Sequence, residues 1–332
     1  MQSNEEPAPG LATKTMDGAQ NSAGTDRRLI VFGAGYVGGA LARMAVAAGW
    51  RVTALTRNPE TAEALRAAGC AAVVSRLEAE DWWDAPEMRA GAARVAVTVA
   101  AGGGGAEGYR RSYVDGLANV VAWARRSLER GPGSLERGAG GEERGAGHLI
   151  YTSSTSVYPQ GGGARVTEAA PVGGEAETTR ALVEAEEIAA AWPGPATILR
   201  LAGIYGPGRT YLVEQVRRGE ASGNPEAHLN LIHRDDILAA CAAAWARGAA
   251  GAGIFNLADE GAATKGEVVA WLAARLGVGL PRFTGAPAGG RRAVTPDRII
   301  DAALARATLG WRPARPTFRE GYVEVLAASG EA

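Results

Sequence analysis

Residues 28–57 read RLIVFGAGYVGGALARMAVAAGWRVTALTR. An apolar run precedes the first glycine, an alanine-rich segment follows the glycines and ends at Gly49, and a second apolar run begins after Trp50. This order predicts a strand, a tight turn, a helix and a second strand. Residues 28–57 therefore indicate an α/β fold.

The G-x-G-x-x-G spacing of Gly33, Gly35 and Gly38 predicts dinucleotide binding. Gly33 turns the chain off the strand, Gly35 leaves room for a pyrophosphate, and Gly38 lets the helix pack closely on the sheet. Tyr36 and Val37 open the helix, where free N–H groups favour phosphates. The spacing alone is a weak signal in a chain with 47 glycines. The flanking strand and helix favour a binding site over a plain βα turn.

The end of the second predicted strand indicates which dinucleotide binds. Arg57 lies 19 residues after Gly38, Thr56 precedes it, and no acid follows before Glu60. An NAD-preferring site has a carboxylate here for the ribose 2′-hydroxyl, whereas a guanidinium pairs with a 2′-phosphate. We therefore predict that the chain prefers NADP(H) over NAD(H) as its cofactor. The alternative is a solvated arginine at a strand end, which leaves the preference open.

Composition excludes several classes of partner. A formal net charge of −1 gives no electrostatic argument for nucleic acid or an anionic membrane surface. No run reaches the roughly 18 apolar residues of a membrane span. Cys70 and Cys241 lie far apart without zinc-ligand spacing, so we expect no metal and two buried, reduced thiols, as in the cytoplasm. The sequence leaves a homodimer open.

Apolar runs and helical segments alternate along the chain, which predicts a doubly wound parallel sheet of the Rossmann type with its ligand at the carboxyl ends of the strands. The predicted strands are 28–33, 51–56, 71–74, 94–99, 148–153, 196–201 and 253–257. The predicted helices are 36–48, 59–68, 109–126, 178–191, 234–247 and 265–276.

We predict two domains. The cofactor-binding domain spans 27–202 and about 234–258, and a smaller substrate domain spans about 203–233 and 259–326. Residues 1–26 and 327–332 are predicted to be tails. The repetitive, glycine-rich and charged stretch 127–147 is predicted to be a solvated insertion.

Five further segments carry a resemblance to a known family. They read YTSSTSVY at 151–158, EAAP at 168–171, LRLAGIYGPG at 199–208, LIHRDDI at 231–237 and LGWRP at 309–313. With the glycine turn, their order resembles the extended short-chain dehydrogenase/reductase family, also called the NAD-dependent epimerase/dehydratase family, over about 28–326. The resemblance implies a Rossmann domain, a nicotinamide cofactor and a cleft that often binds nucleotide-linked sugars.

One expected motif of that family is missing. The family pairs a serine or threonine with a later Tyr-x-x-x-Lys, in which the tyrosine exchanges a proton with the substrate and the lysine lowers the tyrosine pKa. The only lysines here are Lys14 and Lys265. The tyrosine position falls on Thr178 or Thr179, and the lysine position on Leu182 or Val183. The chain is therefore identified as an atypical member.

The resemblance implies the remaining site residues. Ser154 matches the catalytic serine and would bond a substrate oxygen. Tyr158 and Tyr205 are weaker candidates for a surrogate acid, with packing or lining of the cleft as their alternative roles. His233 and Arg209 are candidate substrate contacts. The predicted cofactor contacts beyond the glycine turn are Thr56, Arg57, Ala100, Ala101, Thr152, Ser153, Ala202 and Ile204.

Three functions compete on this evidence. The first is an NADP(H)-dependent oxidoreductase that acts on a small carbonyl, hydroxyl or nucleotide-linked substrate. The second is a non-catalytic NADP(H)-binding redox sensor, which the missing tyrosine and lysine also fit. The third is a nucleotide-sugar epimerase or dehydratase, which the missing tyrosine disfavours because those reactions need a base on a substrate hydroxyl. Each predicts a small-molecule partner.

Overall fold

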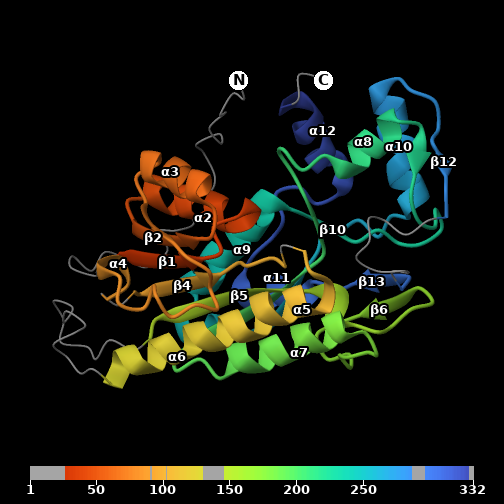
Figure 1. Ribbon diagram of the computed structural model, residues 1–332. Coiled ribbons are helices and arrows are strands. Elements are labelled where there is room, and N and C mark those ends of the chain that lie inside the picture. The colour runs from red at the N-terminus through yellow and green to blue at the C-terminus, as the bar shows by residue number, and fades with distance from the viewer. Residues whose placement is uncertain (1–26, 90–91, 102, 130–145, 286–295, 329–332) are drawn as a thin grey trace.

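A seven-stranded parallel sheet forms the centre of the molecule (Figure 1). The computed structural model describes residues 27–89, 92–101, 103–129, 146–285 and 296–328. The strand order is β11-β7-β5-β4-β1-β2-β3. The strands are β1 (Arg28–Phe32), β2 (Arg51–Thr56), β3 (Ala71–Val74), β4 (Arg94–Val97), β5 (His148–Ser154), β7 (Ala196–Leu201) and β11 (Gly253–Leu257). The predicted doubly wound sheet is confirmed.

Helices cover both faces of the sheet (Figure 1). On one face lie α2 (Tyr36–Ala47), α3 (Pro59–Ala67), α9 (Arg234–Ala246) and α11 (Ala303–Leu309), and on the other α6 (Gly116–Glu129) and α7 (Glu177–Ala190). The inner strands are apolar without regular alternation because both of their faces are buried, whereas the edge strand β3 is partly exposed.

The helix predicted over 109–126 is built from three consecutive pieces. They are α5 (Gly105–Tyr109), a π-helical segment η1 (Arg110–Asp115) and α6. Residues 127–129 of the predicted insertion continue α6, and 130–145 lie outside the described residues. Both predicted tails also lie outside them, apart from residues 327 and 328, which end α12 (Phe318–Ala328). A π-helical turn inside a helix is frequently found at functional sites.

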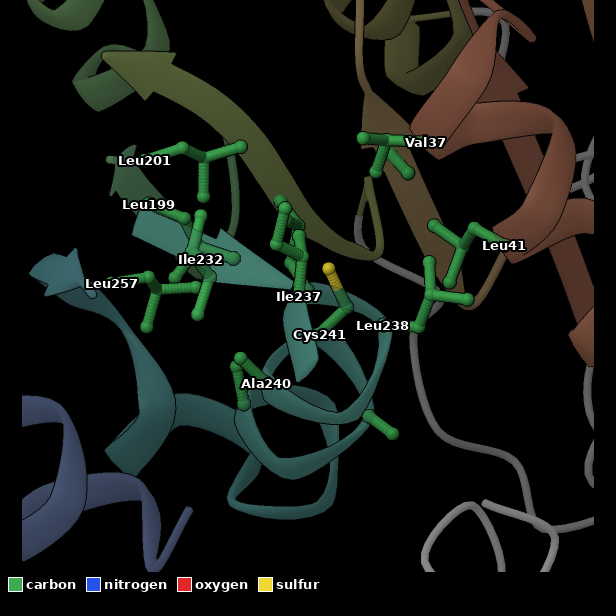
Figure 2. Close-up of a cluster of buried hydrophobic side chains, with 14 of the residues drawn as sticks. Val37, Leu41, Leu199, Leu201, Ile232, Ile237, Leu238, Ala240, Cys241 and Leu257 are labelled. Carbon is green, nitrogen blue, oxygen red and sulfur yellow. The ribbon is translucent and has the colours of Figure 1, made fainter. Parts of the chain in front are cut away.

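The core beside α2 contains both cysteines. Figure 2 shows Cys241 of α9 among apolar side chains that include Leu238 and Ile237, with Val37 and Leu41 of α2 nearby. The Cys241 side chain is fully buried, and burial raises the pKa of its thiol to about 12. Cys70 is also buried and free, as the sequence predicted.

A smaller set of elements packs around a separate apolar cluster. It contains β8 (Gly203–Tyr205), α8 (Tyr211–Arg217), β9 (Glu220–Ala221), β10 (Leu231–His233), α10 (Lys265–Leu276), β12 (Arg282–Phe283) and α12. The described ranges contain no helix with both the length and the apolar character needed to cross a bilayer. The division into two domains stays a prediction.

Several elements were not predicted. They are the helices α4 (Pro86–Arg89), α8, α11 and α12, two short 3₁₀ turns, Thr155–Val157 and Gly248–Gly251, and the strands β6 (Ala164–Val166), β8, β9, β10, β12 and β13 (Arg298–Ile300). The strands pair in twos, as β8 with β10, β9 with β12 and β6 with β13. Strands of two or three residues are too short to show a hydrophobic period.

Candidate functional site

The glycine turn after β1 has the geometry that its sequence predicted. Gly33 adopts a φ of +84°, and its N–H and that of Ala34 donate to the Leu55 carbonyl at 3.0 and 3.2 Å. A Cβ on Gly38 would lie 2.2 Å from Thr98 Oγ1, so α2 packs against the sheet as closely as a glycine allows. A Cβ on Gly35 would meet nothing within 4 Å.

The first turn of α2 faces a cavity with free backbone donors. Gly35 precedes the helix without a side-chain cap, and the N–H of Gly39 makes the first bond back to the Gly35 carbonyl, at 2.8 Å. The N–H groups before Gly39 in this turn therefore have no intrahelical acceptor. Gly33, Gly35, Tyr36 and Val37 all line the cavity. This arrangement fits a pyrophosphate.

The cavity has a volume of about 960 Å³ and extends from the ends of β2 and β3 to the elements around α8 and α10. These elements, which pack around the separate apolar cluster, are called the smaller lobe below. Most of the predicted site residues line it, namely Gly33, Gly35, Tyr36, Val37, Thr56, Arg57, Ala100, Thr152, Ser153, Ser154, Ala202, Ile204 and Arg209. Five predicted residues are not part of its lining: Gly38, Ala101, Tyr158, Tyr205 and His233. Gly38 instead supports the turn from behind.

The end of the cavity at β2 and β3 is cationic. Arg57 lines it, and so does Arg76, which follows β3 and was not predicted. Glu78 is the only carboxylate among the described lining residues, and Arg76 Nε contacts it at 2.9 Å. Asn58 accepts from the N–H of Glu60 at 2.8 Å and so caps α3. No local pattern of residues indicates a role for Arg76, because β3 is short and its connection is irregular.

Ser153 and Ser154, at the end of β5, have different environments. The Ser153 hydroxyl donates to Glu186 Oε1 at 2.6 Å, so its hydrogen is already used in a buried hydrogen bond. Ser154 Oγ accepts from the Ser156 N–H at 3.1 Å, which uses a lone pair and leaves the hydroxyl hydrogen to donate. Ser154 is half-buried and lines the cavity. Its hydroxyl can therefore bond a substrate oxygen.

Tyr158 belongs to a buried polar network rather than to the cavity. Arg200 forms an ion pair with Glu186 at 2.6 Å and donates to the Tyr158 hydroxyl at 2.7 Å. That hydroxyl donates to Asn256 Oδ1 at 2.8 Å. Burial raises the pKa of Tyr158 despite the nearby Arg200. Tyr158 is 1% exposed, so this geometry argues against the surrogate acid and favours the packing role.

Tyr205 and His233 also lie behind the cavity. The Tyr205 ring packs 4.7 Å from Tyr322 and 5.3 Å from His233, and burial raises the Tyr205 pKa well above its ordinary value. His233 is completely buried and its Nδ1 accepts from the Asp235 N–H at 3.3 Å, which caps α9. Desolvation lowers the His233 pKa to about 4. These positions favour structural roles over acid catalysis and substrate contact.

Ala101 is buried beside the cavity instead of lining it. Its N–H points to the Tyr113 hydroxyl at 3.4 Å. Tyr113 is one of several lining residues from α5 and η1, with Tyr109 and Ser112. The Tyr109 and Tyr113 rings lie 5.2 Å apart. Tyr113 was not among the predicted site residues, and the π-helical turn that carries it has no local sequence pattern.

α7 presents the apolar side chain of Leu182, one of the two predicted lysine positions, to the cavity. Its sequence, ETTRALVEAEEIAA, contains neither tyrosine nor lysine. Leu182 lines the cavity, whereas Thr178 and Thr179 do not. The helix is held to η1 by Arg110, which donates to both carboxylate oxygens of Glu184 at 3.0 and 3.1 Å. This wall of the cavity therefore lacks an amine.

The opposite end of the cavity lies in the smaller lobe. Arg209 stands 5.4 Å from the centre of the Tyr36 ring, and the Tyr36 hydroxyl donates to the Pro207 carbonyl at 3.1 Å. Asn224, His228 and Lys265 also line this end and were not predicted. Asn224 and His228 come from an irregular segment and Lys265 is the first residue of α10, and sequence periodicity does not indicate that these side chains line a cavity.

A comparison with protein families identifies the chain. The model of the "NAD dependent epimerase/dehydratase family" matches residues 29–258. The chain belongs to this family. The match includes β1, the glycine turn and β5, and thus both Gly35 and Ser154. As a member of the family, the protein has the Rossmann-type fold expected to bind a nicotinamide dinucleotide.

This family member is similar to several known proteins. Protein YeeZ of Escherichia coli K12 is 27% identical over 290 residues, which cover 86% of this chain and 95% of YeeZ. A functionally unknown conserved protein from Silicibacter pomeroyi DSS is 26% identical with a TM-score of 0.70, covering 92% and 99% of the two chains. The Bordetella bronchiseptica enzyme WbmG, solved with NAD and UDP, shares the fold with a TM-score of 0.73 at 16% identity, covering 92% and 94%.

The residues present fit a nicotinamide dinucleotide. Gly35 leaves open space beside the uncapped start of α2, and Arg57 lines the same cavity. The pyrophosphate would lie at the glycine turn and the adenosine ribose near Thr56 and Arg57. The nicotinamide half would then extend toward Ser154, because ligands of such sheets cross the carboxyl ends of the strands.

Proposed function

We propose that the protein is an NADP(H)-dependent oxidoreductase that acts on a small carbonyl or hydroxyl compound. The observation that supports this most directly is the cavity itself, which joins the glycine turn, Arg57 and the half-buried Ser154. A cofactor bound at the first two would leave the Ser154 end for a substrate. The proposal includes nucleotide-linked compounds that carry such a carbonyl or hydroxyl group.

When bound, the reduced cofactor supplies a hydride to the carbonyl carbon of the substrate. The carbonyl oxygen gains electron density, and the Ser154 hydroxyl donates a hydrogen bond to it. The oxygen then takes one proton from solvent, which completes an alcohol. Solvent is the source in this proposal because α7 offers neither tyrosine nor lysine and the Tyr158 and Tyr205 hydroxyls lie behind the cavity lining.

The NADP(H) preference is supported by the charges near Arg57. Arg76 joins Arg57 at this end, and Glu78, the carboxylate that lines it, already contacts Arg76. A 2′-phosphate would find two cations, whereas a bare diol would find no carboxylate of its own.

The preference is tested by titration of the protein with NADPH and NADH in a calorimeter. We expect tighter binding of NADPH, and Arg57→Ala should weaken NADPH by roughly 1–3 kcal/mol while NADH changes little. Arg218→Met, which removes an exposed arginine outside the cavity, is the control. Equal affinities for both cofactors would contradict the preference.

The activity is tested by following oxidation of NADPH across a panel of aldehydes, ketones and 2-oxo acids, and reduction of NADP⁺ by the matching alcohols. A substrate whose turnover depends on Ser154 would support the proposal. Tight NADPH binding with no turnover across the panel would overturn it.

A non-catalytic redox sensor is the second candidate. Leu182 supports it, because this side chain puts an apolar group where the family pattern has a lysine. A sensor would bind NADPH and change its shape without turnover. Limited proteolysis with and without NADPH would show this as altered cleavage, and an inactive protein with an unchanged pattern would contradict it.

A further inference from the structure

The cavity ends in the smaller lobe beside Lys265, the only lysine among the described residues. The backbone N–H of Lys265 donates to the Ala227 carbonyl at 2.9 Å, which ties the start of α10 to the loop before β10. Its Nζ lies 3.5 Å from Ser222 Oγ. A Cβ on Gly223 would also lie 3.5 Å from this ammonium. The lysine is therefore packed into the cavity wall.

Lys265 has no counter-charge near it in the described part of the chain. No carboxylate lies within ion-pairing distance of its Nζ, and Glu78, the acidic residue of the cavity lining, contacts Arg76 and Arg111 instead. Burial lowers the pKa of Lys265, since desolvation disfavours the ammonium. Partial burial of an unpaired cation is unfavourable. A ligand with a negative charge would remove this cost.

Two polar groups beside Lys265 are already oriented. His228 Nδ1 lies 2.8 Å from Asp297 Oδ1, and the His228 backbone N–H donates to the same oxygen at 2.9 Å. This pair fixes the ring and leaves Nε2 for a further contact. Asn224 uses its Oδ1 to accept from the Glu226 N–H at 3.0 Å, which leaves the side-chain NH₂ as a donor. Both residues line the cavity.

We propose that the substrate carries an oxyanion, a carboxylate or a phosphate, that binds Lys265 with Asn224 and His228. The inference rests on the proposed function, because it places the anion at one end of the substrate and the reacting carbon toward Ser154. Arg209, which also lines the cavity, adds a second positive charge to it. The site thus selects for anionic aldehydes, ketones or alcohols over neutral ones.

Calorimetric titration with inorganic phosphate and with acetate tests this site directly. The protein is first saturated with NADPH, so that the probes cannot occupy the cofactor site. We expect at least one probe to bind, Lys265→Met to weaken it at least fivefold, and Lys265→Arg to stay within threefold of the parent protein. Arg218→Met removes an exposed arginine of the same lobe outside the cavity and should change the affinity less than twofold. Tighter binding of phosphate would indicate a phosphate group on the substrate, and tighter binding of acetate would indicate a carboxylate.

Two results would overturn the proposal. One is the absence of binding by either probe, and the other is binding that Lys265→Met leaves unchanged. If Lys265→Met fails to fold, Lys265→Gln carries the same comparison. If NADPH itself does not bind, the proposed function fails, and the same titration in the Arg57→Ala background still decides whether the anion site exists. For an active substrate, Lys265→Met should raise KM more than it lowers kcat.

Discussion

The β1–α2 side and the β5–α7 side of the cavity are built in different ways. At β1–α2 the site consists of backbone N–H groups and glycines, and its shape depends on the close packing of Gly38 against Thr98. At β5–α7 the buried side chains of Glu186, Arg200 and Tyr158 hold the elements together. One side depends on the absence of side chains, and the other depends on their charges.

This difference separates cofactor binding from chemistry. The β1–α2 side has the open Gly35 and the uncapped start of α2 that fit a dinucleotide. The β5–α7 side places Ser154 in the cavity lining, and α7 directs Glu186 into a buried ion pair and presents Leu182 to the cavity. The cofactor site is thus built mainly from backbone, whereas the substrate side depends on which side chains β5 and α7 present.

The largest expected effect is on the β5–α7 side. Glu186→Ala should lower the free energy of unfolding by about 3–5 kcal/mol, because it leaves the buried Arg200 cation without its carboxylate. Chemical denaturation measures the loss. Glu184→Ala on the same helix is the control, because its contact with Arg110 is largely exposed and its removal should leave the midpoint nearly unchanged. Similar losses in both variants would remove the contrast between the two sides.

Two identical substitutions test the β1–α2 side. Gly38→Ala should lower the free energy of unfolding by roughly 1–3 kcal/mol, because the new methyl overlaps Thr98 Oγ1 and the Gly33 carbonyl. Gly35→Ala should leave the midpoint of unfolding unchanged, since the methyl enters open space, but should weaken NADPH at least tenfold. Denaturation and calorimetry distinguish the two effects. A Gly35→Ala protein with full affinity would show that the pyrophosphate lies elsewhere.

The buried groups behind the substrate side should make stability depend on pH. His233 has a pKa of about 4 in the fold against an ordinary 6.5, so below about pH 6.5 the unfolded chain binds a proton that the folded chain excludes. Stability should therefore fall as the pH drops from 6.5 toward 4. His233→Asn keeps a side chain that caps α9 and should reduce this fall by roughly 1–3 kcal/mol. The remaining pH dependence in this variant comes from His148, whose pKa is also lowered by burial to about 4. Parallel pH curves for the two proteins would exclude the effect.

The smallest expected effect concerns Ser154. Ser154→Ala should reduce turnover about tenfold, or roughly 1.4 kcal/mol, with NADPH affinity unchanged. Thr178→Ala is the matched control, because Thr178 does not line the cavity and should leave turnover as it is. An equal loss of NADPH affinity in Ser154→Ala would place the hydroxyl on the cofactor instead of the substrate.

The sequence by itself determined the elements of the central sheet and the glycine turn. Buried parallel strands give continuous apolar runs, and Gly33, Gly35 and Gly38 act within six residues, so both signals are local. Ser154, which the family resemblance indicated, lies in the cavity lining, and its role in chemistry stays a prediction. The sheet and the glycine turn could be predicted because each depends on neighbours in the chain or on a short motif.

Only the tertiary structure decided which way side chains of the same motif point. Ser153 and Ser154 are adjacent and both line the cavity, yet the Ser153 hydroxyl donates to Glu186 whereas the Ser154 hydroxyl accepts from Ser156 and keeps its hydrogen to donate. Tyr158 points into the core, where its hydroxyl accepts from Arg200, a residue 42 positions later in the chain. Lys265 reaches the cavity because the start of α10 packs on a loop that precedes it by about 40 residues. Such contacts arise from packing between distant segments, and no local pattern of residues encodes them.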